Sequence, residues 1–150
     1  MRRRLAALLA LSALVLTACA RQEAAEPIES KTSTEETNMI LRIDGTQVPV
    51  TWEENESVQA LHALAPLTIE MSMYGGFEQV GPIGSSLPRN DRQTTTAPGD
   101  LVLYSGNQLV VFYGTNQWAY TRLGHVDLTK EELTALLSEH DVTIALEAEE

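Results

Sequence analysis

The side chains of this sequence that are best suited to bind a ligand are aromatic rings close to charged groups. Trp118 and Tyr120 alternate within an extended stretch, so both should point to one face of a strand. They could form the wall of a groove, with Arg122 or Glu78 fixing its polar end. Ordinary packing in a core or at a barrel rim would use the same residues. The candidate binding residues are Tyr74, Gly76, Phe77, Glu78, Arg89, Trp118, Tyr120 and Arg122.

Other kinds of catalytic or metal chemistry find little support in the sequence. The three histidines are far apart and form no His-x-His or His-Glu-x-x-His motif, so we expect no metal site. Ser85 and Ser86 lack the Gly-x-Ser-x-Gly pattern of a nucleophile elbow. The glycines from 75 to 84 are followed by neither Gly-Lys-Ser/Thr nor a helix, so we interpret them as turn residues. No cofactor is expected.

Cys19 is the only cysteine of the 150 residues, and it ends an apolar leader. Residues 1–19 read MRRRLAALLALSALVLTAC, in which three arginines precede an apolar run, as in secretory signal peptides. The run is shorter than the roughly 20 residues of a membrane-spanning helix. Its ending, Leu-Thr-Ala-Cys at 16–19, resembles the lipobox of bacterial lipoproteins. That resemblance implies lipidation of the Cys19 sulfur and cleavage before it, whereas an ordinary secreted protein with an incidental cysteine is the alternative.

We therefore expect a membrane-anchored protein of the cell envelope that faces outside the cytoplasm. Two or more acyl chains such as palmitate on Cys19 would anchor it stably, and either an inner or an outer membrane is compatible. We predict a signal peptide at 1–18, the lipidated cysteine with a disordered tether at 19–38, and a folded domain at 39–150. The tether is rich in Glu, Ser, Thr and Ala, too polar to offset the entropy cost of ordering.

The charge of the chain argues against a nucleic-acid partner. The formal net charge is −11, and the three leader arginines belong to the only strongly basic stretch. A nucleic acid would find little to neutralise its phosphates. The acidic surface serves solubility or, alternatively, recognition of a basic partner. The partner of the folded domain is left open as an unknown peptide, protein or small-molecule ligand.

Hydrophobic patterns predict a mainly β domain with two short helices. Alternation predicts half-buried strands, and the successive apolar residues 110–112 predict a strand buried on both faces. Thr129 and Glu132 form a capping box for the second helix, and Gly124 marks a bend or bulge. The expected strands are 39–44, 47–52, 67–73, 100–104, 109–113, 118–126 and 142–147, and the expected helices are 55–65 and 128–139.

The segment 74–97 is rich in glycine, proline and threonine but also carries five large apolar residues. A loop this long in a compact domain is usually functional, and we expect short extended pieces at 78–80 and 93–97. The helices do not alternate with parallel strands, which disfavours a doubly wound sheet. A closed antiparallel β-barrel, with helices covering its ends, explains the strand count without long exposed edges.

Four segments resemble the small bacterial cyclophilin-like domain family. They are Met-Ser-Met-Tyr-Gly-Gly-Phe-Glu-Gln at 71–79, Ser-Leu-Pro-Arg-Asn-Asp at 86–91, Pro-Gly-Asp-Leu-Val-Leu-Tyr at 98–104 and Tyr-Thr-Arg-Leu-Gly at 120–124. The resemblance covers about residues 39–148 and implies a closed cyclophilin-like β-barrel. It leaves activity open, because such domains are often found without demonstrated isomerase function.

Two functions therefore follow from the sequence. The first is a lipid-anchored module that binds a peptide or small ligand without strong catalysis. The alternative is an extracytoplasmic peptidyl-prolyl cis-trans isomerase. In true cyclophilins a Phe-His-Arg stretch supplies an arginine that weakens the prolyl amide resonance and so lowers a high rotation barrier. Neither that stretch nor the accompanying Phe-Met-x-Gln segment occurs here, which favours the binding module.

Overall fold

The computed structural model describes residues 38–149, which form a mainly β domain with two helices. The predicted signal peptide, the Cys19 lipidation site and all but the last residue of the predicted tether lie outside the described residues. No helix within 38–149 has the length and apolar character needed to cross a membrane. The mainly β prediction with two short helices is confirmed.

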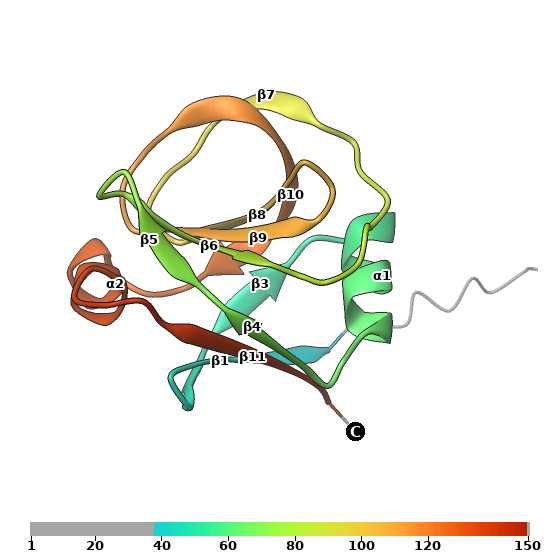
Figure 1. The fold of residues 1–150 in the computed structure, drawn as a ribbon, viewed down its shortest axis with the longest axis horizontal. Helices are drawn as coiled ribbons and strands as arrows, with labels where there is room; N and C mark the ends of the chain where they lie inside the picture. The colour runs from blue at the N-terminus through green and yellow to red at the C-terminus, as the bar shows by residue number, and fades with distance from the viewer. Residues whose placement is uncertain (1–37, 150) are drawn as a thin grey trace, which may run out of the picture. The chain divides into compact units, whose positions relative to one another are not determined.

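Eleven strands and the two helices follow one another along the described chain (Figure 1). In chain order they are β1 (Met39–Ile43), β2 (Thr46–Val48), β3 (Val50–Trp52), α1 (Glu56–Ala63), β4 (Leu67–Glu70), β5 (Ser72–Tyr74), β6 (Glu78–Pro82), β7 (Arg92–Thr95), β8 (Asp100–Tyr104), β9 (Gln108–Phe112), β10 (Gln117–Val126), α2 (Lys130–Leu137) and β11 (Thr143–Ala148).

The strands pair into two antiparallel sheets rather than one closed ring. The smaller sheet has the order β2-β1-β11-β4, and the larger has the order β3-β10-β8-β9-β6-β5, with β7 added to β10. The single closed barrel predicted from the sequence is therefore not confirmed. Two of the predicted continuous strands instead break at corners and pass from one sheet to the other.

A single residue marks each of the two corners. Pro49 separates β2 from β3, and a proline has no N–H to give to a strand ladder. Met71 separates β4 from β5, and its backbone N–H donates to Val142 O at 2.9 Å. The predicted strands 47–52 and 67–73 are thus each divided between the two sheets, and past the second corner the predicted inward face is lost, since β5 is exposed throughout.

The main core lies on the inner face of the larger sheet, and the helices contribute to it. Both sheets supply aliphatic side chains, such as Leu41 and Ile144 from the smaller sheet and Leu103 from the larger one. Leu61 of α1 and Leu133 of α2 are fully buried in the same cluster. Figure 1 shows the two helices on opposite sides of the domain.

Both helices begin with a side-chain cap. Asn55 accepts a hydrogen bond from Val58 N, and Thr129 forms the predicted capping box with Glu132. A side-chain cap satisfies a backbone N–H that has no partner within the helix and stabilises it by about 1 kcal/mol.

A second, smaller cluster lies on the outer face of the larger sheet. It contains Val102, Val110, Phe112 and Tyr120, with Phe77 packed against it. Strand β9 contributes to both clusters, since Leu109 and Val111 face the main core while Val110 and Phe112 face outward. The prediction that this strand is buried on both faces is confirmed.

Strand β10 explains how the outer face becomes covered. It is ten residues long, and its pairing with β8 shifts register between Arg122 and Gly124, where the sequence predicted a bend or bulge. The first half of β10 pairs with β7, and Figure 1 shows this part curving away from the sheet in an arch over β8 and β9. A bulge increases strand twist and bends the strand, which allows one strand to pair with β8 in the sheet and with β7 in the arch.

Candidate functional site

Two pockets divide the candidate binding residues that the sequence suggested. The aromatic pocket has a volume of about 370 Å³ and is lined by Tyr74, Glu78, Val80, Tyr104, Val110, Asn116, Trp118 and Tyr120. The arginine pocket has a volume of about 350 Å³ and is lined by Asn55, Glu56, Ser57, Pro88, Arg89, Asn90, Arg92, Thr94, Tyr120, Thr121 and Arg122. Tyr120 lines both. Gly76 and Phe77 line neither pocket.

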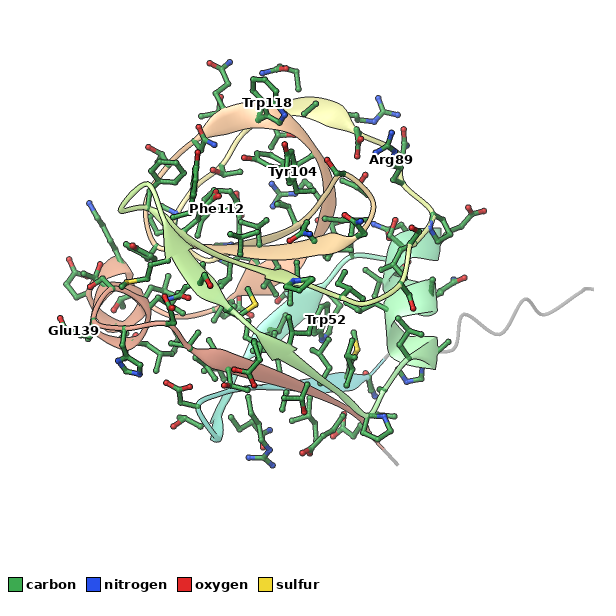
Figure 2. All side chains as sticks on the ribbon, in the orientation of Figure 1. Trp52, Arg89, Tyr104, Phe112, Trp118 and Glu139 are labelled. Atoms are coloured by element: carbon green, nitrogen blue, oxygen red, sulfur yellow. The ribbon has the colours of Figure 1, made fainter. Side chains whose placement is uncertain are left out.

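Five strands of the larger sheet and the loop after β9 build the aromatic pocket. Tyr74 ends β5 and Glu78 begins β6, and these two residues are register partners. Tyr104 ends β8, while Trp118 and Tyr120 come from the arched half of β10. Alternation along β10 puts Trp118 and Tyr120 on the same wall, as their spacing predicted. Figure 2 shows Trp118, Tyr104 and Phe112 in this region.

A chain of aromatic contacts supports the pocket from below. Phe112 stacks parallel to Phe77 with ring centroids 6.5 Å apart, and it meets Tyr120 edge-on at 5.6 Å. Phe77 also meets Tyr74 edge-on at 6.4 Å. Such pairs add about 0.5–1.5 kcal/mol each beyond the burial of their surface. Phe77 therefore acts as a support for the pocket wall rather than as part of its surface.

The two glycines between Tyr74 and Phe77 form the turn that allows this contact. Gly75 and Gly76 have φ values of 64° and 73°, a region that favours glycine. A Cβ on Gly75 would collide with the Phe77 ring, whereas a Cβ on Gly76 would meet open space. Gly76 therefore allows the turn to form. It was predicted as a binding residue, but it lines neither pocket.

The exposed apolar surface of the described residues concentrates at the aromatic pocket. The exposed large apolar side chains are Met73, Tyr74 at 64%, Tyr104 at 39% and Trp118 at 57%. All but Met73 line this pocket. Apolar surface gathered in one concave place is typical of a binding site, since scattered single residues would need no explanation.

Glu78 is the unusual polar group of the aromatic pocket. Its side chain is only 7% exposed, and its Oε2 is buried without a hydrogen-bond partner among the described residues. Burial raises the pKa of Glu78 to about 7, because a carboxylate away from water and from cations is costly to ionise. The group is therefore close to half-protonated at neutral pH, and it lines the pocket.

Tyr120 connects Glu78 to the rest of the pocket. Its hydroxyl oxygen accepts a hydrogen bond from Asn116 Nδ2 at 2.9 Å, and its ring meets Tyr104 edge-on at 6.1 Å. Burial, followed by the negative charge of Glu78, raises the pKa of Tyr120 above its usual range. The phenol stays neutral at physiological pH, so it contributes an aromatic face and a hydroxyl group.

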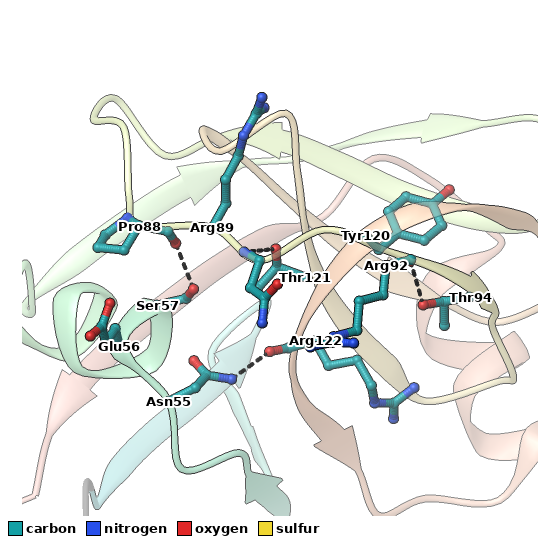
Figure 3. Close-up of a pocket in the computed structure, with 11 residues that line it drawn as sticks. Asn55, Glu56, Ser57, Pro88, Arg89, Arg92, Thr94, Tyr120, Thr121 and Arg122 are labelled. Carbon is teal, nitrogen blue, oxygen red and sulfur yellow. Dashed lines mark hydrogen bonds between the residues drawn. The ribbon is translucent and has the colours of Figure 1, made fainter.

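The arginine pocket lies between the start of α1, the chain before β7 and the middle of β10 (Figure 3). Its polar groups are largely satisfied by one another. Asn55 donates to Arg122 O at 2.9 Å, Ser57 donates to Pro88 O, and the Asn90 N–H donates to Thr121 Oγ1 at 2.8 Å. These bonds tie three chain segments together, which is a structural role in itself.

Two of the arginines at this pocket are paired with carboxylates. Arg122 donates to Asp100 Oδ1 at 3.1 Å and lies 3.5 Å from Glu53, and Arg89 lies 3.6 Å from Asp91. Burial acts to raise the pKa of Asp100, but hydrogen bonds from Arg122, the Ala97 N–H and His125 outweigh it, and the net pKa is lowered. The positive charges of Arg122 and Arg89 are thus already compensated by carboxylates within the protein.

The structure brings together part of what the sequence suggested and adds residues that the sequence missed. Tyr74, Glu78, Trp118 and Tyr120 meet in the aromatic pocket, whereas Arg89 and Arg122 lie in the other one. Tyr104 and Asn116 were not among the candidates, and the sequence predicted only a strand at 100–104. A large aromatic residue at the exposed end of a buried strand was the available signal. No group of His, Cys, Asp and Glu residues in the described part of the chain could hold a metal ion.

Comparison with known proteins gives one informative match. A model of the cyclophilin-like family matches residues 41–147, which include every strand and helix from β2 to α2, the last three residues of β1 and all but the last residue of β11. A search of curated proteins finds no match to this chain.

Proposed function

The chain belongs to the cyclophilin-like family, and we propose that its aromatic pocket binds a small ligand or a short peptide segment. The single observation that carries the proposal is the coincidence of exposed aromatic rings and a buried, unpartnered carboxylate in one pocket. Tyr74, Tyr104 and Trp118 offer apolar surface to a ligand, and Glu78 offers one directed polar contact. A mainly apolar cleft with a few placed polar groups is the usual form of a ligand site.

Binding is favoured over prolyl isomerisation because of where the arginines lie. An isomerase of the cyclophilin kind needs a free guanidinium beside the apolar groove that holds proline. The residues that line the aromatic pocket include no arginine, and Arg122 lies in the other pocket, paired with Asp100 and Glu53. Moving Arg122 away would take one of the partners from Asp100, whose side chain is only 7% exposed, and this is unfavourable for a buried carboxylate.

Screening the purified protein with a fragment library that includes proline peptides, by ligand-observed NMR, tests the proposal. Ligands that bind the wild-type protein should bind weakly or not at all to Trp118→Ala and Tyr74→Ala. Met73→Ala is the matched control, because Met73 is exposed beside Tyr74 on β5 but does not line the pocket. Hits that survive both pocket variants would overturn the assignment. Acceleration of proline isomerisation in a protease-coupled assay would favour the alternative instead.

We also propose that the protein is a lipoprotein of the cell envelope, anchored through Cys19. The support is the leader of residues 1–19, whose one cysteine stands directly after the apolar segment and a small residue. Metabolic labelling with a palmitate analogue tests it: the wild-type protein should carry the label in the membrane fraction, and Cys19→Ser should not. Equal labelling of Cys19→Ser would refute the lipid site.

A further inference from the structure

The aromatic pocket has the composition of a site for a positively charged organic group. The faces of tyrosine and tryptophan rings carry negative electrostatic potential and attract cations, with tryptophan the strongest. Tyr74, Tyr104, Trp118 and Tyr120 supply four such rings from three different strands. Rings that converge from separate strands can surround a ligand group on several sides.

The same pocket carries an anionic group without a protein cation to neutralise it. The Glu78 side chain is only 7% exposed, and its Oε2 has no hydrogen-bond partner in the part of the chain that the structure describes. The other lining groups do not compensate it: Val80 and Val110 are apolar, and the Asn116 amide donates to Tyr120. A buried carboxylate of this kind is costly unless something pairs with it.

A ligand that brings a positive charge would remove this cost, and the rings would hold its alkyl groups. We propose that the aromatic pocket is specific for an alkylated ammonium group, held against the carboxylate of Glu78 by the four rings. The inference rests on the proposed ligand-binding function and names the ligand class of that same site. The volume of about 370 Å³ has room for a trimethylammonium head with a short tail.

The pairing requires an ionised Glu78, so affinity should depend on pH. The titratable side chains that face Glu78 are Tyr74 of β5, Tyr104 of β8 and Tyr120 of β10, while β9 presents the apolar Val110 and Phe112. Burial, followed by the negative charge of Glu78, raises the pKa of Tyr120 above its usual range, so Tyr120 stays neutral in this pH interval. Burial raises the pKa of Glu78 to about 7. Affinity for the cation should therefore rise roughly 20-fold between pH 5.5 and pH 7.5 and then level off.

Calorimetric titration of the purified protein with two probes of the same shape tests the inference. The probes are choline and its neutral isostere 3,3-dimethylbutan-1-ol. At pH 7.5 the wild-type protein should bind choline at least about tenfold more tightly than the alcohol. Glu78→Gln keeps the shape of the side chain and should lose the pH dependence, while the preference for choline should fall to the smaller part that the rings supply. Glu70→Gln, at an exposed position of β4, is the control and should behave as wild type.

The outcomes separate this inference from the proposed function. If the alcohol binds as tightly as choline, or if Glu78→Gln leaves choline affinity unchanged, the cation assignment is overturned while the ligand pocket stands. If neither probe binds but other ligands bind in a Trp118-dependent way, the cation assignment is overturned as well. If neither probe nor any screened fragment binds, both proposals fail. A trimethyllysine peptide distinguishes the two sources of the cation. If the peptide binds more tightly than choline, the ligand is a peptide; if it binds more weakly, the ligand is a free small molecule.

Discussion

Replacing Glu78 by glutamine should change how the stability of the protein depends on pH. The side chain is 7% exposed and its Oε2 is unpartnered among the described residues, so the folded state favours the protonated acid. Burial raises the pKa of Glu78 from its ordinary value of 4.5 to about 7. Because the folded state holds the proton more tightly, this group favours folding most below pH 4.5, and the benefit is lost as pH rises toward 7.

The size of the effect follows from the pKa difference. Each pKa unit corresponds to about 1.4 kcal/mol, so ionisation of Glu78 lowers the free energy of unfolding by up to about 3 kcal/mol above pH 7. Glutamine cannot ionise and nearly keeps the shape of the acid. The difference in unfolding free energy between Glu78→Gln and wild type should therefore rise by about 3 kcal/mol from pH 4.5 to pH 8.

Urea unfolding at a series of pH values, followed by tryptophan fluorescence, measures this difference. Titration of the other groups of the protein cancels in the comparison, and Glu70→Gln provides the control at an exposed site. Carbon NMR of the Glu78 carboxyl group should show a midpoint near 7. A difference that stays flat with pH would mean that Glu78 is solvated or paired when it ionises, and the description of the pocket would then be wrong.

Three further predictions concern the framework that holds the pocket. Gln79→Leu should lower the free energy of unfolding in urea by about 2–4 kcal/mol. The reason is that the fully buried Gln79 amide donates to Leu137 O at 2.7 Å and to His140 O at 2.8 Å. A loss no larger than that of Gln47→Leu, at an exposed position, would contradict this. Gly124→Ala should cost about 1–3 kcal/mol in thermal unfolding, since a Cβ would stand 2.6 Å from Thr51 O at the bulge, and wild-type stability would show that the bulge has room. Thr129→Ala should cost about 1 kcal/mol by loss of the α2 cap, and an equal or larger loss in Thr134→Ala of the same helix would refute a specific capping role.

Much of the fold could be predicted from the sequence because most of its signals are local. The capping box at Thr129 and the bulge before Gly124 are both predicted from a few neighbouring residues. The corners at Pro49 and Met71 could not be predicted in the same way. Hydrophobic alternation continues through a corner, and which sheet each half joins depends on distant strands such as β11 and β10.

The candidate site was predictable only in part, for a related reason. The alternation of Trp118 and Tyr120 correctly predicted a shared wall, but only the arch of β10 decides that this wall faces Tyr104 rather than solvent. Arg122 comes two residues after Tyr120, yet the bulge that follows it and its pairing with Asp100 keep it in the other pocket. The burial of Glu78 likewise depends on strands that are remote in sequence.

Nitrogen-labelled NMR of the protein, titrated with choline and separately with 3,3-dimethylbutan-1-ol, tests most directly whether the aromatic pocket is the ligand site. At least one probe should shift the indole N–H signal of Trp118 and the amide signals of Tyr104 and Asn116 most strongly. Signals of Arg89 and Arg92, at the arginine pocket, should move little. Largest shifts at the arginine pocket would contradict the assignment of the aromatic pocket as the site of binding, and no shifts with either probe would contradict its assignment to a cation.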